Sequence, residues 1–456
     1  MEERFKVRLQ QLKAQAVVDP KAVEGALERL VQFMEPYAAC LGPDAQKQHL
    51  TEYVAGSMSN IPRKNVETIA YLHKQDRQPL QKFIGQKEWD ERSMIGVLAG
   101  QVGKAIGRSN GVLVIDPSAM RKQGKKSVGV ARQYCGRIGK VDNCQVGIFF
   151  AYVSDKEHAL VDTRLYLPRE WTDDKARCRA AGVPKERMRF RTRHALALEM
   201  LLEHRDVLPH AWVTGDDEMG KNGGFRDDLT KMKEQYLLCV PSNTHVRDLE
   251  AMPPLSSKTG KTLRKVPYQR ADCWAKSVTN WERIEVRPGE KGPLIVEAAK
   301  CRVQTKRTQR NGPEEVLVVF RVQQGKESFK HDYCLSNAPF DTPLKEFARV
   351  LDAEHRIEEC LRRAKSESGM GSYQVRNWKG WHHHQALTLI ATWFLTQEKI
   401  RGEKGIAQFV CPASALLHWR HAGRDASNPH MDASSLATQP NQLAKRNSSL
   451  LPLEKT

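Results

Sequence analysis

Apolar residues in the first hundred positions recur with the spacing of amphipathic helices. Between residues 23 and 34 they lie three, four or seven positions apart, which places them on one helical face. The same spacing recurs over 45–55, 79–83 and 89–106. These patterns predict a helical N-terminal region that ends near residue 105.

The pattern changes after residue 110, where short apolar runs replace the helical spacing. Gly111–Ile115 has no polar side chain and is followed by Asp116, which is typical of a buried strand with a carboxylate at its end. Two strands separated by a short polar turn predict a hairpin over residues 145–167. The order of the later elements predicts a mixed α/β sheet. These elements are helices at 193–205 and 225–234 and strands at 210–215 and 235–240.

Residues 244–340 have a less regular, β-like pattern interrupted by proline and glycine turns. Alternating runs at 294–305 and 315–323 predict two strands within this segment. Helical spacing returns over 341–360. From about residue 423 the chain is poor in aromatic residues, and we expect this tail to be disordered.

The charge of the chain suggests the kind of partner. Lys and Arg number 73 of the 456 residues against 54 Asp and Glu, which gives a formal net charge of +19. Of this excess, 13 charges lie within residues 106–350, and the segment 117–141 holds seven basic residues and no acidic one. Further basic clusters lie at 185–193 and 300–310. One such cluster is often a solvated surface, but several together predict a polyanionic partner, either nucleic acid or an anionic membrane.

The sequence gives no support to a membrane protein or a disulfide scaffold. Its longest apolar runs, 146–153 and 386–395, are far shorter than the roughly 20 residues of a spanning helix. Residues 1–9 lack the apolar core of a secretion signal. The ten cysteines include no CxxC pair, so neither a structural zinc site nor a disulfide framework is expected. We therefore expect a soluble, cytoplasmic protein with no membrane partner.

Three carboxylates are candidates for chemistry. Asp116 and Asp216 each follow a predicted strand, and Glu358 lies on a predicted helix that could pack against the same sheet. A single acid at a strand end is usually a turn former or a helix cap. Three converging carboxylates in a basic protein would form the oxygen ligand set that Mg²⁺ or Mn²⁺ prefers. Two such ions about 3.5–4 Å apart can catalyse cleavage of a phosphodiester.

Several blocks in a fixed order resemble a known family. They are residues 114–116 followed by the basic segment 122–148, then 212–229, then 356–365 followed by 373–395. In these blocks the chain resembles DDE transposases of bacterial insertion sequences, in the branch with a β-rich insertion between the second Asp and the Glu. The resemblance extends over roughly residues 20–400.

The resemblance implies an α/β fold like that of ribonuclease H, with a mixed five-stranded sheet, a β-rich insertion and an N-terminal helical domain. The domains it implies are a DNA-binding region at 1–105, the first part of the catalytic domain at 106–243, the insertion at 244–340, a helical C-terminal part of the catalytic domain at 341–422 and the tail at 423–456.

By position, the resemblance makes Asp116, Asp216 and Glu358 both the catalytic residues and the ligands of two Mg²⁺ or Mn²⁺ ions. It makes Asp217 a neighbour that points to the other face of the strand if the strand continues. Lys365 lies seven positions after Glu358, where a related branch places a lysine that contacts DNA. The expected DNA-binding residues are Lys365, Lys122, Lys125, Lys126, Arg132 and Arg376.

The match departs from the branch near the third acid. Where the branch has Tyr and Arg, seven and four positions before the Glu, this sequence has Leu351 and Glu354. Glu354, Glu359 and Glu367 therefore remain alternatives to Glu358 as third ligand. The preferred interpretation of Glu359 is a surface ion pair with Arg363.

Three adjacent histidines, His382, His383 and His384, cannot converge on one ion if they lie on a helix. We expect them on a helix edge, packed beside Trp378 and Trp381 or set against the DNA backbone.

The activity implied is metal-dependent cleavage of double-stranded DNA at the terminal inverted repeats of an element, followed by strand transfer into target DNA. A homodimer is implied because two ends must be joined in one complex, and the expected location is the bacterial nucleoid. Two alternatives remain open: an inactive, transposase-derived DNA-binding protein, and a ribonuclease H-like nuclease without strand transfer.

Overall fold

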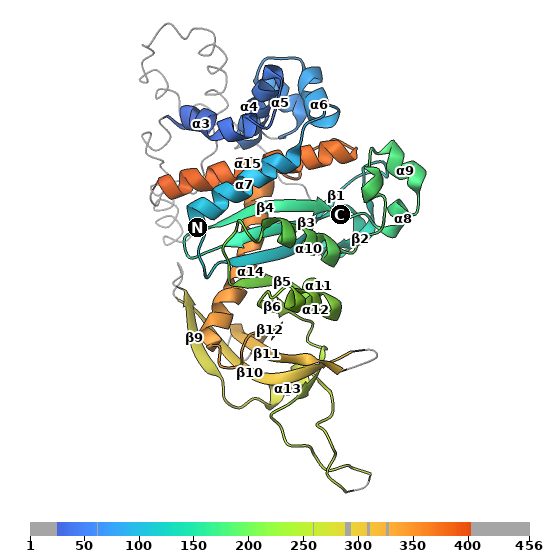
Figure 1. Cartoon of the computed structure of the whole chain (residues 1–456), viewed down its shortest axis with the longest axis vertical. Helices are drawn as coiled ribbons and strands as arrows, with labels where there is room; N and C mark the ends of the chain where they lie inside the picture. The colour runs from blue at the N-terminus through green and yellow to red at the C-terminus, as the bar shows by residue number, and fades with distance from the viewer. Residues whose placement is uncertain are drawn as a thin grey trace, which may run out of the picture.

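A computed structural model describes residues 25–402, apart from 62, 259, 288–292, 308–310 and 325–327. Figure 1 shows three tiers along the long axis of the molecule. The N-terminal helices form one end, a sheet flanked by long helices forms the middle, and a β-rich tier forms the other end. The expected disorder of residues 423–456 concerns a segment outside the described residues.

The N-terminal tier is helical, as the apolar spacing predicts. Its helices are α3 (Ala26–Ala38), α4 (Asp44–Met58), α5 (Val66–Leu72) and α6 (Arg77–Gly85). The next helix, α7 (Glu91–Ile106), lies beside α15 and packs against β4 of the middle tier (Figure 1). The short helix α5 lies outside the predicted patterns; it begins at a capping box in which Asn65 and Thr68 bond each other's backbone.

The middle tier is built on a mixed sheet, which confirms the mixed α/β prediction. Its strands are β1 (Val112–Arg121), β2 (Ala131–Cys135), β3 (Lys140–Val153), β4 (His158–Leu165), β5 (Trp212–Gly215) and β6 (Tyr236–Cys239). Strand β1 pairs antiparallel with β3 and parallel with β5, and β5 pairs parallel with β6. Strand β4 pairs with β3. The apolar run Val112–Ile115 is fully buried at the centre of this sheet.

The same sheet continues into the β-rich tier. Strand β6 pairs antiparallel with β12, and β12, β11, β10, β7 and β8 follow in that order. The elements of this tier are β7 (His245–Asp248), β8 (Gln269–Arg270), α13 (Ala271–Ser277), β9 (Glu282–Arg287), β10 (Leu294–Lys306), β11 (Asn311–Gln324) and β12 (Ser328–Ser336). Both strands predicted in this segment are present as β10 and β11.

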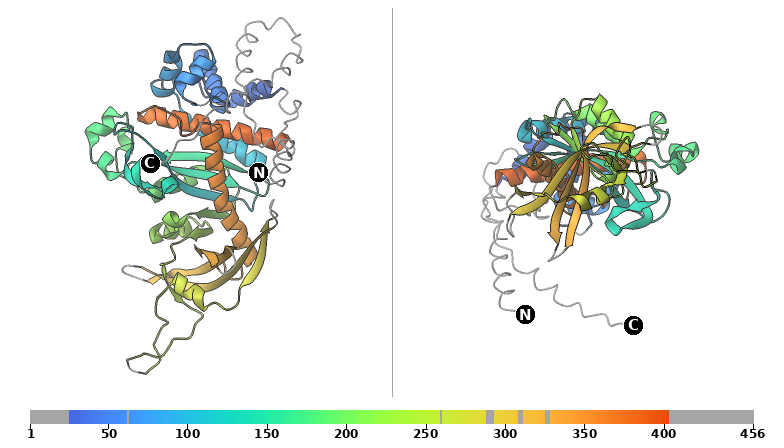
Figure 2. Two further views of the ribbon diagram at one scale, coloured as in Figure 1. Left: turned by 180° about the vertical axis from the view of Figure 1, so that it is seen from behind. Right: turned by 90° about the horizontal axis from the view of Figure 1, so that it is seen from below.

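Helices cover both faces of the sheet. The remaining helices of the described chain are α8 (Arg169–Thr172), α9 (Lys175–Ala180), α10 (Arg193–His204), α11 (Asp217–Gly220), α12 (Gly223–Lys231), α14 (Leu344–Glu367) and α15 (Trp378–Arg401), with single 3₁₀ turns at Gly136–Ile138 and Lys185–Arg187. Helix α14 runs along the molecule from β9 and β10 to β1, β4 and α15 (Figure 2). It therefore connects the β-rich tier with the central sheet.

Helix α15 is buried on nearly every side, packed against α4, α6, α7 and β4. His382, His383 and His384 lie within this buried stretch and bond backbone carbonyl oxygens of the protein. The rings of Trp378 and Trp381 pack against His382, as expected, the first tilted and the second edge-on. The alternative that these histidines face the DNA backbone is wrong, because all three are buried, with exposed fractions of 7% for His382 and 1% for the other two.

None of the helices in the described part of the chain combines the length and the apolar character needed to cross a membrane.

Candidate active site

Asp116 and Asp216 lie side by side on two neighbouring parallel strands. Asp216 directly follows the last residue of β5, but Asp116 lies inside β1, which continues to Arg121, so the prediction that the strand ends before Asp116 is wrong. The register pairs Ile115 of β1 with Gly215 of β5, so each aspartate is the next residue beyond the same pair. Both side chains are half-buried. A Cβ atom on Gly215 would lie 2.8 Å from the carbonyl oxygen of Ile115. The glycine therefore allows the close approach of β1 and β5 that brings the two carboxylates together.

The chain leaves the sheet at Asp216. This residue caps α11, and its Oδ1 accepts a hydrogen bond from the backbone N–H of Met219 at 3.1 Å. Asp217 lies in the first turn of α11 and is exposed. Because β5 ends at Gly215, Asp217 belongs to a helix and does not lie on the opposite face of a strand.

Helix α14 packs on the same face of the sheet as Asp116. Lys365 donates a hydrogen bond through Nζ to Ser118 Oγ at 2.8 Å. Ser118 lies two positions after Asp116 on β1, so their side chains share a face. Glu354, Glu358 and Lys365 are spaced by four and seven residues, which places them along one side of the helix.

The carboxylates of this site repel one another. Burial raises the pKa of Asp116 well above its usual value, the charges of Asp216 and Glu354 raise it further, and Lys365 opposes them. Burial likewise raises the pKa of Asp216 to about 7, although the bond from Met219 lowers it. A cluster of oxygen donors short of positive charge is the environment that a divalent cation stabilises. The residues present therefore fit a metal site.

The four glutamates of α14 that are candidates for the third metal ligand have different surroundings. The pKa of Asp116 is raised by both Glu354 and Glu358. Glu354 is half-buried and Glu358 is exposed. Glu359 lies 3.9 Å from His158 Nε2. Glu367 pairs with Arg363 at 3.2 Å, so the expected pair of Arg363 with Glu359 is wrong.

The basic residues expected to bind DNA are divided between the protein interior and its surface. Lys122 is partly buried: its Nζ lies 3.3 Å from the centre of the Tyr373 ring, and burial lowers its pKa to about 8. The exposed residues are Lys125, Lys126, Arg132 and Arg376. The backbone of Arg376 accepts a hydrogen bond from Val128, so the two segments that carry most of these residues lie together.

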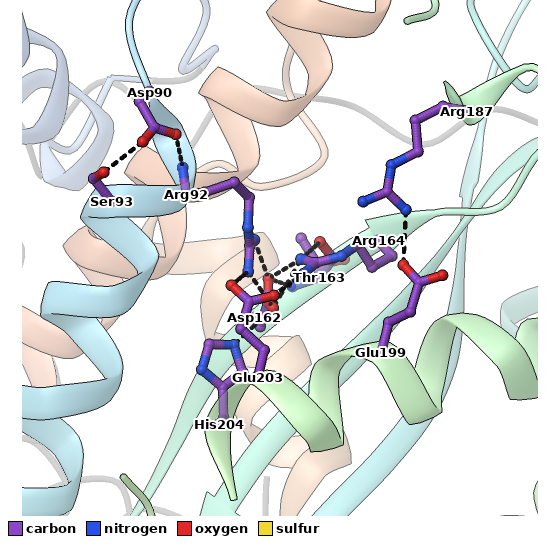
Figure 3. Close-up of polar contacts among 10 residues, drawn as sticks. All are labelled: Asp90, Arg92, Ser93, Asp162, Thr163, Arg164, Arg187, Glu199, Glu203 and His204. Carbon is purple, nitrogen blue, oxygen red and sulfur yellow. Dashed lines mark hydrogen bonds and ion pairs between the residues drawn. The ribbon is translucent and has the colours of Figure 1, made fainter. Parts of the chain in front are cut away.

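A second acidic cluster lies on β4 and α10. Asp162, Glu203 and His204 are the described residues whose metal-type donor atoms lie within 4.8 Å of one another. Both oxygens of Asp162 accept hydrogen bonds at 2.7–2.8 Å from Arg92 and from Arg164, and one of them also bonds His204 at 2.8 Å (Figure 3).

This second cluster is an ion-pair network rather than a metal site. Burial would raise the pKa of Asp162, but Arg164 and Arg92 outweigh it and hold the pKa well below its usual range. Glu203 bonds the same two arginines. The oxygens that a metal would need are already satisfied by guanidinium groups. Sequence reasoning missed this cluster because its members come from α7, β4 and α10, and no local spacing relates them.

The sequence matches the family model described as DDE superfamily endonuclease over residues 36–293, which is more than half of the chain. That match includes Asp116 and Asp216 and stops before α14. The probable transposase for insertion sequence element IS701 of Microchaete diplosiphon is 24% identical over 284 residues, or 61% of this chain and 69% of that protein.

Proposed function

Because this chain belongs to the DDE superfamily endonucleases, we propose that it is the DNA transposase of a bacterial insertion sequence. The reaction is cleavage at the inverted repeats that end the element, followed by transfer of the freed strand into target DNA. The single observation that carries the proposal is the pair Asp116 and Asp216, side by side on adjacent parallel strands beneath a helix that carries glutamates and a lysine.

The catalytic unit in this proposal is the ribonuclease H-like set β4-β3-β1-β5-β6 with α14. The order of these five strands supports it: on one side of β1, β3 is antiparallel to both β1 and β4, and on the other side β5 and β6 run parallel to β1. The β-rich tier, residues 244–340, is then an insertion between the second Asp and the third acid. The helices before residue 106 form the region that recognises the terminal repeats.

Asp116, Asp216 and Glu358 are the proposed ligands of two Mg²⁺ or Mn²⁺ ions, with Glu354 one helical turn before Glu358. Such ions supply activation of the attacking oxygen and stabilisation of charge at phosphorus. The protein contributes the geometry: Gly215 sets the spacing of the two aspartates, and the bond from Met219 fixes the orientation of Asp216.

The basic residues hold the substrate in this proposal. Lys365, fixed beside Ser118, places a positive charge where the reacting phosphodiester meets Asp116. Four further basic residues are exposed: Lys125, Lys126 and Arg132, which follow β1 along the chain, and Arg376, whose backbone bonds the same segment. Their side chains are suited to contact the DNA backbone. The partly buried Lys122 donates a hydrogen bond through Nζ to the backbone carbonyl oxygen of Tyr373, which joins the segment after β1 to the segment that carries Arg376. Two copies of the chain would hold the two ends of the element.

The test is metal-dependent nicking of a duplex that carries the end of the element. The wild-type protein should nick it in Mg²⁺ and not in EDTA, and Asp116→Asn and Asp216→Asn should bind the duplex without nicking it. Binding without nicking by the wild type would contradict the proposal.

A joining assay with precleaved ends tests the second half of the reaction. A transposase should join such ends to a target plasmid, whereas a simple nuclease of the same fold would yield no joined product. Comparing Glu358→Gln with Glu354→Gln in the nicking assay identifies the third ligand, because loss of that ligand should abolish the reaction.

A further inference from the structure

A cavity of about 680 Å³ lies where the middle tier meets the β-rich tier. Its walls come from the segment after Asp216, from the start of β7 and from the end of β10. It is lined by Lys221, Gly223, Gly224, Arg226, Asp227, Thr244, His245, Thr305, Lys306 and Arg307. The third basic cluster of the sequence, residues 300–310, therefore contributes to the wall of a cavity.

Two of the four cations in this cavity are neutralised by buried or partly buried acids. Arg226 is buried and pairs with Glu315 at 2.6 Å, and Tyr236 donates to the same carboxylate at 2.7 Å. Arg307 pairs with Asp227 at 3.2 Å. These contacts join α12 to β10 and β11 and fix the floor of the cavity.

The other two cations, Lys221 and Lys306, are exposed and form no ion pair with the residues that the structure describes. They approach the cavity from different elements, one before α12 and the other at the end of β10. Lys side chains that converge on a cavity without a carboxylate partner attract an anion.

The backbone around Gly223 also favours an anion. Helix α12 begins there, and its first residues, Gly223 and Gly224, line the cavity with N–H groups that have no acceptor within the helix. The side chain of Asn222 caps the N–H of Phe225. A Cβ atom on Gly223 would overlap the guanidinium of Arg307. The glycine thus lets Arg307 reach the start of the helix, where its buried Nε–H has no hydrogen-bond acceptor among the described residues.

We infer that this cavity binds backbone phosphates of the DNA substrate, near the reacting bond. The inference rests on the proposed function, because it places the reacting bond at Asp116 and Asp216. Lys221 follows Asp216 by five residues, a span of at most about 18 Å. With a rise of about 3.4 Å per base pair, the bound phosphates lie within about five base pairs of the cleaved bond.

The test compares the salt dependence of DNA binding in variants that cannot cut. In an Asp116→Asn background, Lys221→Gln with Lys306→Gln removes both unpaired charges. Each lost phosphate contact should reduce the slope of log K against log salt by about 0.9, so the double variant should lose about 1.8. Between 50 and 200 mM salt, its affinity should fall about tenfold less than that of the parent.

The matched control is Lys231→Gln, an exposed lysine at the opposite end of α12. It should leave the slope unchanged. Equal slopes for parent and double variant, or an equal loss in the control, would overturn the inference. Ethylation of phosphates locates the contact: within about five base pairs of the cleaved bond it should weaken binding by the parent and have little effect on the double variant.

Nicking by the otherwise wild-type protein separates this inference from the proposed function. Nicking together with unchanged slopes would disprove the phosphate site and leave the transposase proposal standing. A reduced slope in a protein that never nicks DNA would keep the site and disprove the catalytic proposal.

Discussion

Two acidic clusters lie on opposite faces of one sheet, at nearly the same level. The register places Asp162 opposite Phe150 and Phe150 opposite Ile115, so Asp162 shares a face with Ile115, and the next residue, Asp116, points the other way. On one face Asp162 is surrounded by Arg92, Arg164 and His204. On the other, Asp116 faces carboxylates and Lys365.

The difference shows that the partners of a carboxylate, rather than its burial, determine its role. Burial disfavours the charge of both Asp116 and Asp162. The arginines reverse that effect for Asp162 and hold its pKa low, which makes it a structural anion. Asp116 and Asp216 keep raised pKa values, so their site gains most from a bound cation.

The largest effect should follow from removing a carboxylate on the face of the sheet that carries Asp116. Asp116→Asn should reduce nicking by at least about 10⁴-fold, equivalent to about 5.5 kcal/mol of barrier, because the proposed cations would lose a ligand. In metal-free buffer the variant should unfold at the same temperature as the wild type or higher, since a repulsion is removed. Thermal unfolding and single-turnover nicking measure both quantities.

Magnesium supplies the control for this variant. At a concentration 100 times its dissociation constant, a cation should stabilise the wild-type fold by about 2.7 kcal/mol and should stabilise Asp116→Asn much less. Equal stabilisation of the two proteins would show that Mg²⁺ binds elsewhere.

The opposite face should respond in the opposite way. Asp162→Asn leaves Arg92 and Arg164 without a buried counter-charge and should reduce the free energy of unfolding by about 3–5 kcal/mol. Nicking per folded molecule should change little, because the site lies across the sheet. Urea unfolding at neutral pH provides the measurement.

A matched control is Asp155→Asn, which removes a surface ion pair with Arg108 whose two side chains are 65% and 44% exposed. It should reduce the unfolding free energy by less than about 1 kcal/mol. If Asp162→Asn reduced the unfolding free energy by as little as Asp155→Asn, the ion-pair network around Asp162 would not stabilise the fold.

Local patterns predicted one face of this comparison and missed the other. Asp116 follows the uninterrupted apolar run Val112–Ile115 and Asp216 follows the short segment Trp212–Gly215, and such segments identify buried strands without knowledge of their neighbours. Asp162 stands inside β4, where Thr163 and Arg164 break the apolar pattern. Its partners Arg92 and His204 lie 70 and 42 positions away, so only the folded chain relates them.

Local sequence patterns could predict neither which glutamate is the third ligand nor that the sheet continues from β6 into β12. Glu354 and Glu358 lie on the same side of α14, and spacing alone cannot choose between them. Strand β12 has polar residues along its first half, and its pairing with β6 joins residues about 95 positions apart. Such pairings depend on tertiary contacts that no short window of sequence contains.

A smaller effect should come from Lys365, the positive charge on the face of the sheet that carries Asp116. Lys365→Gln removes that charge and weakens the contact with Ser118, and we expect nicking to slow about tenfold, or about 1.4 kcal/mol. Single-turnover nicking at saturating DNA measures the chemical step apart from binding. Lys345→Gln, an exposed residue near the start of the same helix, should leave the rate unchanged; equal rates for both variants would exclude a role for Lys365 in the reaction.

The smallest effect links the arginine network to a neighbouring histidine. Burial lowers the pKa of His382 to about 3; its bond to the Trp378 carbonyl opposes this, and Arg164, Arg92 and His383 lower it further. The folded protein therefore keeps His382 neutral, while the unfolded chain takes up a proton as the pH falls through about 6.5. Stability that is complete above that pH is lost on acidification, by about 0.8 kcal/mol between pH 7.5 and 6.0.

His382→Gln should abolish this share of the pH dependence. The comparison uses urea unfolding of Asp116→Asn/Asp216→Asn protein, in which those two carboxylates no longer titrate. Between pH 7.5 and 6.0, the protein that retains His382 should lose about 0.8 kcal/mol more than the one that also carries His382→Gln. The same pH dependence in both proteins would mean that His382 is protonated in the fold. That result would require an anionic partner for His382 near Arg92 and Arg164, in conflict with a network in which Asp162 and Glu203 are already used by the two arginines.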